Sequence, residues 1–284
     1  KSSIINSILK KKVSITSRKS QTTRNNILGI KTTNNKQSIF IDTPGLHIKS
    51  KKTMNKILNK SAQSIIEDSD IVLFVMQRLS MIEEDLLIIS KLKETNPLTI
   101  CVINKIDQID NKQKLLPFIE NISSKYNFDS IIPISAKTNQ NIDDLVTKIE
   151  DNLPENEHIY DEKFMVNSND NKFMISELIR EKIIRNLGDE LPHETYVEIE
   201  EIESKNKTIH ISAVIYVNRK SQKHIVIGSN GDLLKKIGKE ARQDIENFLN
   251  NKVFLKTWVK VKRNWNTDSS FIYSLGVGNN YESN

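Results

Sequence analysis

Residues 38–45 read Ser-Ile-Phe-Ile-Asp-Thr-Pro-Gly, an apolar run that leads directly into a polar turn. The run predicts a buried strand, and Pro-Gly marks the turn that ends it. In an open α/β sheet, ligands bind just beyond the carboxyl ends of the strands. There the Asp42 carboxylate can hold Mg²⁺ through water, and the Gly45 amide can approach a terminal phosphate because no Cβ obstructs it. An ordinary strand followed by a turn fits the same residues, so the neighbouring motifs decide between the two interpretations.

Three further apolar runs, 71–76, 99–103 and 131–134, also predict strands. Helical spacing of apolar residues separates them. Strands that alternate with helices of about 10–15 residues favour parallel βαβ units, so we expect an α/β fold with a mostly parallel sheet. The helical patterns cover residues 4–9, 54–66, 83–94, 112–126 and 142–149.

Two polar segments precede residue 38. Lys1 and Ser2 open the first helical pattern, where a lysine can reach the β- and γ-phosphates of a nucleotide and a hydroxyl can ligate Mg²⁺. The loop 17–24 contains Thr23, whose hydroxyl can complete the Mg²⁺ shell and become ordered when the terminal phosphate is bound. A Lys-Ser pair alone carries no signal, and a basic surface loop also fits residues 17–24.

The motif Asn104-Lys105-Ile106-Asp107 follows the strand predicted at 99–103. An Asp carboxylate can accept hydrogen bonds from both N1–H and the 2-amino group of guanine, a pair that adenine lacks. A site built on such hydrogen bonds strongly rejects the analogue without them. Asn104 would tie two loops together, and Lys105 would cover the face of the base. Ser135-Ala136-Lys137 follows the last strand, so the polar motifs succeed one another along one edge of the sheet.

Length and composition indicate a globular protein of two domains. The 284 residues suffice for two domains of about 100–200 residues each, and 37% are hydrophobic and 27% charged. No apolar run approaches the roughly 20 residues that span a bilayer. The single cysteine, Cys101, excludes an intrachain disulfide and lies in an apolar run, which favours an inert buried thiol.

The charge is concentrated in the second half of the chain. The net charge is +6 and the pI is about 9.1. Residues 218–263 contain 12 Lys/Arg and 4 Asp/Glu, which gives 12 − 4 = +8. This excess favours a polyanionic partner, although a solvated surface in a Lys- and Asn-rich chain is the alternative.

A Gly-x-x-Gly segment marks the second half. A helical pattern at 173–187 and strands at 195–202 and 208–217 precede Gly228-Ser229-Asn230-Gly231, and a helix at 232–249 and a strand at 253–261 follow it. Backbone amides of such a loop and the helix N-terminus can approach a nucleic-acid phosphate, whereas a simple helix-entry turn is the alternative. The cations of the following helix are Lys235, Lys236, Lys239 and Arg242.

The two tryptophans near the end of the chain are candidates for stacking on bases. Trp258 lies within the last predicted strand, where side chains alternate between the two faces, so we expect it in the core instead.

The Gly-x-x-Gly loop itself carries no cation, because Ser229 and Asn230 lie between the glycines and the acidic Asp232 follows them. We therefore expect the helix lysines to supply most of the attraction for phosphate.

The first half resembles the small GTPases of translation, and most closely the Era GTPase family. Its loop pattern Ser-Arg-Lys-x-Gln-Thr-Thr-Arg occurs at 17–24, and its Asp-Thr-Pro-Gly-Leu-His occurs at 42–47. The second half resembles a bacterial-type KH domain, which that family carries after its GTPase domain. The resemblance implies a P-loop GTPase domain over 1–154, a linker over 155–171, and a smaller α+β type II KH domain over 172–284.

The family resemblance also implies roles for individual residues. Ser2, Thr23 and Asp42 would form the metal shell, and no residue is assigned as catalytic. Residue 46 is Leu where Ras-type enzymes carry the water-orienting Gln, so we expect slow hydrolysis unless a partner or a monovalent ion assists. The implied GTP-binding residues are Lys1, Ser2, Thr23, Asp42, Thr43, Pro44, Gly45, Asn104, Lys105, Asp107, Ser135, Ala136 and Lys137.

The implied function is that of a GTP-binding and GTP-hydrolysing, RNA-binding switch, with GTP, GDP and Mg²⁺ as ligands. By resemblance, it would bind the 3′ region of small-subunit ribosomal RNA during assembly of the small ribosomal subunit. We expect a cytoplasmic monomer, with a peripheral position on the inner face of the cell membrane as an alternative. A nucleotide-independent RNA-binding scaffold with a vestigial GTPase fold is the alternative function.

The chain begins at Lys1 without Met, which suggests a fragment or a processed product. By the family pattern, a chain that truly starts there would lack the first strand and most of the phosphate loop. We would expect such a chain to bind and hydrolyse GTP weakly or not at all.

Overall fold

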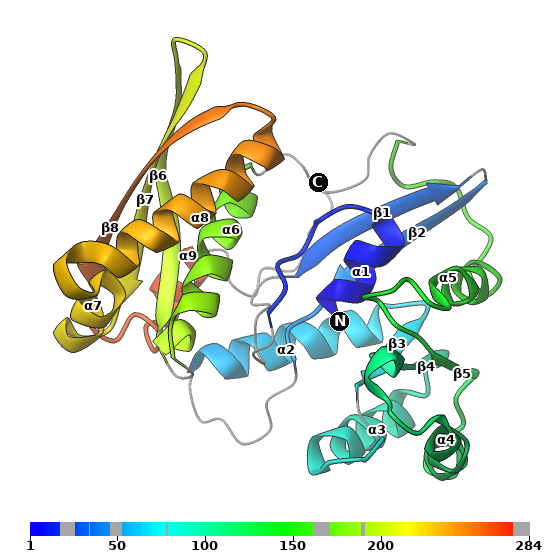
Figure 1. Cartoon of the computed structure of the whole chain (residues 1–284). Helices are drawn as coiled ribbons and strands as arrows, with labels where there is room; N and C mark the ends of the chain where they lie inside the picture. The colour runs from blue at the N-terminus through cyan, green and yellow to red at the C-terminus, as the bar shows by residue number, and fades with distance from the viewer. Residues whose placement is uncertain are drawn as a thin grey trace. The chain divides into compact units, whose positions relative to one another are not determined.

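The computed structural model describes residues 1–17, 26–33, 35–45, 53–77, 79–161, 171–188 and 191–274. These residues divide into two compact units, which are described separately below (Figure 1). Lys1–Ser14 and most of the described chain up to residue 161 form the first unit. The residues from 171 onward form the second, together with residues 15–17 and 53–57. No helix in the described ranges is both long and apolar enough to cross a membrane.

The first unit contains a parallel sheet with the strand order β3-β4-β5. These strands are β3 (Val72–Met76), β4 (Thr99–Ile103) and β5 (Ser130–Pro133), each joined to the next through a helical connection. The predicted strands therefore have the predicted βαβ order. The helices of this unit are α1 (Ser2–Leu9), α3 (Glu83–Thr95), α4 (Leu115–Ser123) and α5 (Ile142–Glu150), together with α2 (Thr53–Glu67) from Leu58 onward.

Two apolar cores lie on opposite faces of this sheet, because the side chains of β4 alternate between them. Ile100 and Val102 pack with α1 and α5, whereas Cys101 and Ile103 pack with α3 and α4. Every residue of β4 is buried, as expected for a strand covered on both faces. Burial raises the pKa of the Cys101 thiol to about 12, so this thiol stays protonated and inert, as predicted.

The strand predicted around Phe40 does not pair with the described parallel sheet. It is β2 (Lys36–Asp42), an antiparallel partner of β1 (Ile27–Thr33), a strand that the sequence analysis missed. Burial in β2 alternates: Ser38, Phe40 and Asp42 are buried, whereas the intervening isoleucines are only half-buried. The predicted strand is present and is buried on one face only, because β2 turns that face toward the core of α1 and α5 and leaves its other face more accessible.

Gly29 lies where β1 packs on α1, and a side chain there would require Leu9 to move within the core. A Cβ at this position would lie 2.5 Å from Leu9 Cδ1 and 3.3 Å from Ile5 Cγ2, both in the core. We expect Gly29→Ala to lower the free energy of unfolding by about 1–3 kcal/mol through overpacking. Denaturant unfolding measures this change. Gly188→Ala is the control, because a Cβ there meets no atom within 4 Å. Equal stability of the two variants would contradict the packing.

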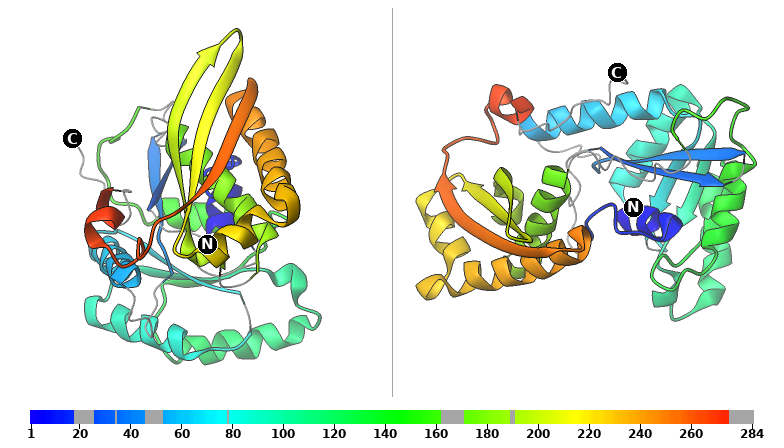
Figure 2. Two further views of the ribbon diagram at one scale, coloured as in Figure 1. Left: turned by 90° about the vertical axis from the view of Figure 1, so that its left-hand side faces the viewer. Right: turned by 90° about the horizontal axis from the view of Figure 1, so that it is seen from above.

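The second unit has a three-stranded sheet with two long helices on one face (Figure 2). β6 (Thr195–Lys205) and β7 (Thr208–Val217) are antiparallel, and β8 (Lys252–Val261) runs parallel to β7. The helices α6 (Asn171–Asn186) and α8 (Asp232–Leu249) pack on each other and on the sheet around a shared apolar core. A short helix, α7 (Lys220–Ile227), precedes α8, and α9 (Ser269–Ser274) ends the described chain.

The sequence analysis missed α7, and both tryptophans differ from what it predicts. The segment Ile225-Val226-Ile227 belongs to α7, although β-branched residues favour strands, because Val226 packs into the core. Trp265 is fully buried and donates from Nε1 to the carbonyl of Glu194 over 3.1 Å, so it cannot stack on a base. Trp258, expected in the core, is half-buried and lies under the ammonium groups of Lys256 and Lys260.

Candidate functional site

The phosphate end of the predicted nucleotide site lies where β2 ends and α1 begins. The Ser2 hydroxyl donates to Asp42 Oδ2 over 2.6 Å, and the Ser14 hydroxyl donates to the same oxygen over 2.9 Å. Asp42 is 2% exposed. Lys1 Nζ donates to the carbonyl of Thr43 over 2.6 Å. The structure thus brings four predicted site residues together, two of which offer the hydroxyl and carboxylate oxygens that Mg²⁺ prefers.

The electrostatics of this end are set by desolvation and by Asp42. Desolvation lowers the pKa of the Lys1 side chain, and the Asp42 carboxylate partly offsets that effect. Pro44 is buried and Gly45 is half-buried directly after these residues. Thr23 and Leu46 lie outside the described residues, so the predicted metal ligand and the residue in the Gln position have no described placement.

Asn104 joins two loops at the predicted base-binding end. Its side chain is buried, and its Oδ1 accepts hydrogen bonds from the backbone N–H groups of Lys105, over 2.7 Å, and Ala136, over 3.1 Å. Its own backbone N–H donates to the carbonyl of Met76 at the end of β3. Lys105 has a left-handed backbone with φ of 67°, which turns the chain out of β4. Asn104 therefore fixes the ends of three strands relative to one another.

Asp107 presents an exposed carboxylate beside this junction. Its Oδ1 accepts from the Ser135 hydroxyl over 2.7 Å, and Ser135 Oγ accepts in turn from the backbone N–H of Thr138. Within the described part of the chain, Asp107 Oδ2 has no hydrogen-bond partner. Lys137, also exposed, follows two residues after Ser135. The carboxylate is thus oriented from one side and open on the other.

A hydrogen bond links α1 to the loop at the base-binding end within the first unit. The Ser7 hydroxyl of α1 donates to Asn139 Oδ1 over 2.5 Å, in the loop that follows Ser135. The motifs thus lie along one rim of the unit.

The Gly-x-x-Gly segment forms the tight connection between α7 and α8. Gly228 and Gly231 have φ of 75° and 82°, and Asn230 has φ of 52°. A Cβ on Gly228 would lie 2.7 Å from Leu233 Cβ, so this position requires glycine for space as well as for conformation. The segment Ser229–Gly231 is a single turn that leads into the N-terminus of α8. Backbone N–H groups at such an entry can bind a phosphate.

The predicted basic residues of α8 are all exposed. Lys235, Lys239 and Arg242 follow the spacing i, i+4 and i+7, which places them on one face of the helix. Lys236 lies 4.0 Å from Glu240, an exposed pair that adds little stability. Ile225 of α7, an apolar residue near the loop, is 54% exposed. The sequence analysis missed this exposed side chain because its exposure depends on how α7 packs.

One rim of the first unit thus carries the motifs that the sequence analysis assigns to guanine, phosphate and Mg²⁺, and a Gly-x-x-Gly loop lies between helices of the second unit. This combination indicates the class of GTPases that carry a KH domain. The family model for a 50S ribosome-binding GTPase matches residues 1–105, and the KH domain model matches residues 190–266. The fold prediction is therefore confirmed.

Similar proteins identify the family. GTPase Era of Pseudomonas syringae pv. tomato is 43% identical over 278 residues, which cover 98% of this chain and 92% of that protein. GTPase Era of Haemophilus influenzae is 44% identical over 277 residues, which cover 97% and 91%. This chain belongs to the Era GTPase family.

Solved structures agree with that assignment. A variant of Aquifex aeolicus Era bound to GDP·AlF4⁻ is 34% identical, with a TM-score of 0.92 over 97% of this chain and 94% of that one. A complex of Era with MgGDPNP and nucleotides 1506–1542 of 16S ribosomal RNA is 35% identical, with a TM-score of 0.92 over 97% and 93%.

Proposed function

We propose that this chain is a GTP-driven RNA-binding switch that acts in small ribosomal subunit assembly by binding the 3′ region of small-subunit ribosomal RNA. The observation that carries the proposal is the Asp107 carboxylate, oriented by Ser135 and open toward solvent, on the same rim as the Ser2–Asp42 pair. The Era complex with MgGDPNP and a 16S ribosomal RNA segment supports both the ligands and the RNA.

The geometry of this rim supports the proposed roles in nucleotide binding. Lys1 and the first N–H groups of α1 would hold the phosphates, and Thr43, Pro44 and Gly45 would border the terminal phosphate. Asp107 would accept two hydrogen bonds from guanine, Lys105 would cover the base, and Ala136 would brace it. The buried Asn104 keeps these loops in register.

The oxygens at the phosphate end fit a hard divalent cation. Ser2 would ligate Mg²⁺ directly and Asp42 through water, because these two oxygens already lie 2.6 Å apart, and Thr23 would complete the shell. When bound, Mg²⁺ neutralises charge that develops on the phosphate oxygens. With Leu46 in the position of a water-orienting Gln, hydrolysis would be slow without a partner or a monovalent ion.

The RNA site would lie at the loop Gly228–Gly231. Its amides would contact the backbone of single-stranded RNA, as in KH domains, and Lys235, Lys239 and Arg242 would attract further phosphates. Because Ser229 and Asn230 carry no charge, the cations of α8 would supply most of the electrostatic attraction.

We further propose the domain boundaries 1–154, 155–171 and 172–284 for the GTPase domain, linker and KH domain. The chain would act as a monomer in the cytoplasm, with peripheral binding to the inner face of the cell membrane as the alternative location. Its basic second half, with pI about 9.1 overall, favours ribosomal RNA as the main polyanionic partner.

Crosslinking in cells tests the RNA partner. Full-length protein is crosslinked to RNA with ultraviolet light, purified under denaturing conditions, and the attached fragments are sequenced. We expect enrichment of the 3′ end of small-subunit ribosomal RNA. A parallel culture with Gly228→Ala should lose that enrichment, because the variant distorts the loop. Recovery of no ribosomal RNA with the unmodified protein would overturn the proposed partner.

A further inference from the structure

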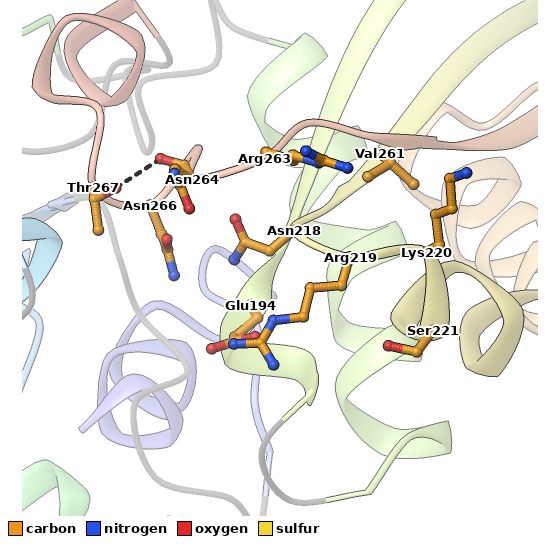
Figure 3. Close-up of a pocket in the computed structure, with 10 residues that line it drawn as sticks. All are labelled: Glu194, Asn218, Arg219, Lys220, Ser221, Val261, Arg263, Asn264, Asn266 and Thr267. Atoms are coloured by element: carbon orange, nitrogen blue, oxygen red, sulfur yellow. Dashed lines mark hydrogen bonds between the residues drawn. The ribbon is translucent and has the colours of Figure 1, made fainter.

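A pocket of about 640 Å³ lies in the second unit, at the end of α7 opposite the Gly-x-x-Gly loop. Figure 3 shows the residues that line it: Glu194, Asn218–Ser221 before and within α7, Val261 at the end of β8, and Arg263, Asn264, Asn266 and Thr267 after β8. Because β7 and β8 are parallel, Val217 and Val261 end at the same edge of the sheet, and the backbone N–H of Lys262 donates to the carbonyl of Val217. The two loops that follow these strands form the pocket.

The walls of this pocket are held in place by the core. The Gln222 side chain accepts hydrogen bonds from the backbone N–H groups of Asn218 and Arg219, both over 2.9 Å. The fully buried Trp265 anchors the other wall through its hydrogen bond to the Glu194 carbonyl. The pocket is therefore a built concavity, and its volume is within the range of ligand sites in proteins.

The charge of the pocket favours an anion. Arg219, Lys220 and Arg263 line it and are exposed, and none of the three forms an ion pair with another described residue. Glu194 is the one carboxylate among the lining residues, and the Gln222 amide donates to it. Three cations against one engaged carboxylate create a positive field in a concave site.

The polar groups of the pocket also suit a ligand that carries donors. Asn218 Oδ1 is buried and has no hydrogen-bond partner among the described residues. A buried acceptor of this kind is costly unless a bound group or water satisfies it. The amides of Asn264 and Asn266 line the same pocket and can both donate and accept. A nucleotide, which carries an anionic phosphate and a base with donors, fits this combination.

We infer that this pocket, named here the Arg219 pocket, binds one nucleotide of an RNA strand that extends beyond the Gly-x-x-Gly loop. The inference rests on the proposed RNA-binding function. The pocket and the loop lie at the two ends of α7, whose eight residues span about 12 Å, a distance that a few nucleotides can bridge. The Arg219 pocket thus lengthens the RNA footprint at one end.

The test compares a long RNA with short pieces of it, using the full chain. The long probe contains nucleotides 1506–1542 of 16S ribosomal RNA, and the short probes are overlapping pieces of about four nucleotides, the length that a KH loop clamps. We expect Arg219→Gln and Arg263→Gln each to lower the affinity for the long RNA about 5- to 30-fold. Each should leave the affinity for the tightest-binding short piece within twofold of that of the unmodified chain. Each variant should also reduce the salt slope of long-RNA binding by roughly 0.7.

Two matched variants serve as controls. Lys207→Gln removes one exposed cation at the hairpin between β6 and β7, at the other end of β7 from the pocket, and should leave both affinities unchanged. Gly228→Ala should weaken both probes. Because Arg219 and Arg263 are exposed, their variants should retain the thermal midpoint of the unmodified chain.

Several outcomes would overturn the inference. Unchanged affinity for the long RNA in both arginine variants would remove the pocket from the RNA footprint, and an equal loss on long and short probes would place these arginines in the loop site itself. If the two arginine variants lose binding of inorganic phosphate but keep their RNA affinity, the pocket would be a site for a free anion. If the unmodified chain binds neither RNA, the proposed RNA-binding function fails as well.

Discussion

Asp107→Asn is expected to shift nucleotide preference from GTP toward xanthosine triphosphate by about 100- to 1,000-fold. The Asp107 carboxylate can accept hydrogen bonds from both N1–H and the 2-amino group of guanine. The amide of an Asn side chain would instead place its own NH2 group opposite one of these two N–H donors. Xanthine has a carbonyl in place of the 2-amino group and can accept from that amide. Because Ser135 donates to Oδ1, an Asn side chain can keep this hydrogen bond and the local geometry. Competition of the two triphosphates against a fluorescent GTP analogue measures the shift.

Asp110→Asn is the matched control for this experiment. Asp110 is an exposed carboxylate three residues further along the chain, and its replacement changes the net charge by the same amount. We expect it to retain the preference for GTP. If the Asp107 variant also retained that preference, Asp107 would not read guanine and the assignment of the base-binding end would be wrong.

Gly228→Ala is expected to reduce RNA affinity about 10- to 100-fold while GTP affinity stays the same. The change places a Cβ 2.7 Å from Leu233 Cβ at a residue with φ of 75°, so the loop must move and its amides lose their alignment. Strain and lost phosphate contacts of about 1–3 kcal/mol account for the size of the effect. Fluorescence anisotropy with a labelled RNA measures it.

Gly238→Ala separates loop geometry from a general effect of replacing glycine. Gly238 lies within α8, and the nearest atom to a Cβ there is Thr257 Oγ1 at 3.8 Å, an ordinary contact. This variant should keep its RNA affinity and gain up to about 1 kcal/mol of helix stability. Full RNA affinity in the Gly228 variant would show that the loop does not hold the RNA backbone.

The sequence predicted those parts of the fold in which local pattern and tertiary packing agree. β4 is apolar throughout and is buried on both faces, and α8 has the predicted bounds Asp232–Leu249. α3 (Glu83–Thr95) nearly matches the predicted range 83–94, and it is capped by Asn96 in a left-handed conformation directly before Pro97. In each case a single periodicity and a clear stop signal fix the element.

The missed elements are those in which neighbours outweigh the local pattern. β1 contains Gly29, a weak strand former, and is a strand because β2 pairs with it along its whole length. α7 contains three consecutive β-branched residues and is helical because Val226 fills the core and the Gln222 side chain caps the helix start. Neither reason can be read from the residues of the segment alone.

The candidate sites follow the same rule. The placement of Asp42, Asn104 and Ser135 was predictable because each of them lies at or just after the end of a strand, and Asn104 and Ala136 meet as strand ends should. The Arg219 pocket was not predictable, because its walls come from three separate segments whose proximity depends on the parallel pairing of β7 and β8. Residues gathered by topology carry no local pattern.

The affinity of the full chain for one RNA, measured with a non-hydrolysable GTP analogue, with GDP and without nucleotide, tests the switch most directly. The probe contains nucleotides 1506–1542 of 16S ribosomal RNA. If the nucleotide site is coupled to the RNA site, the chain should bind this RNA about 5- to 150-fold more tightly with the GTP analogue than with GDP or without nucleotide. Equal affinity in all three states would contradict the switch and would favour a scaffold that binds RNA without regard to nucleotide.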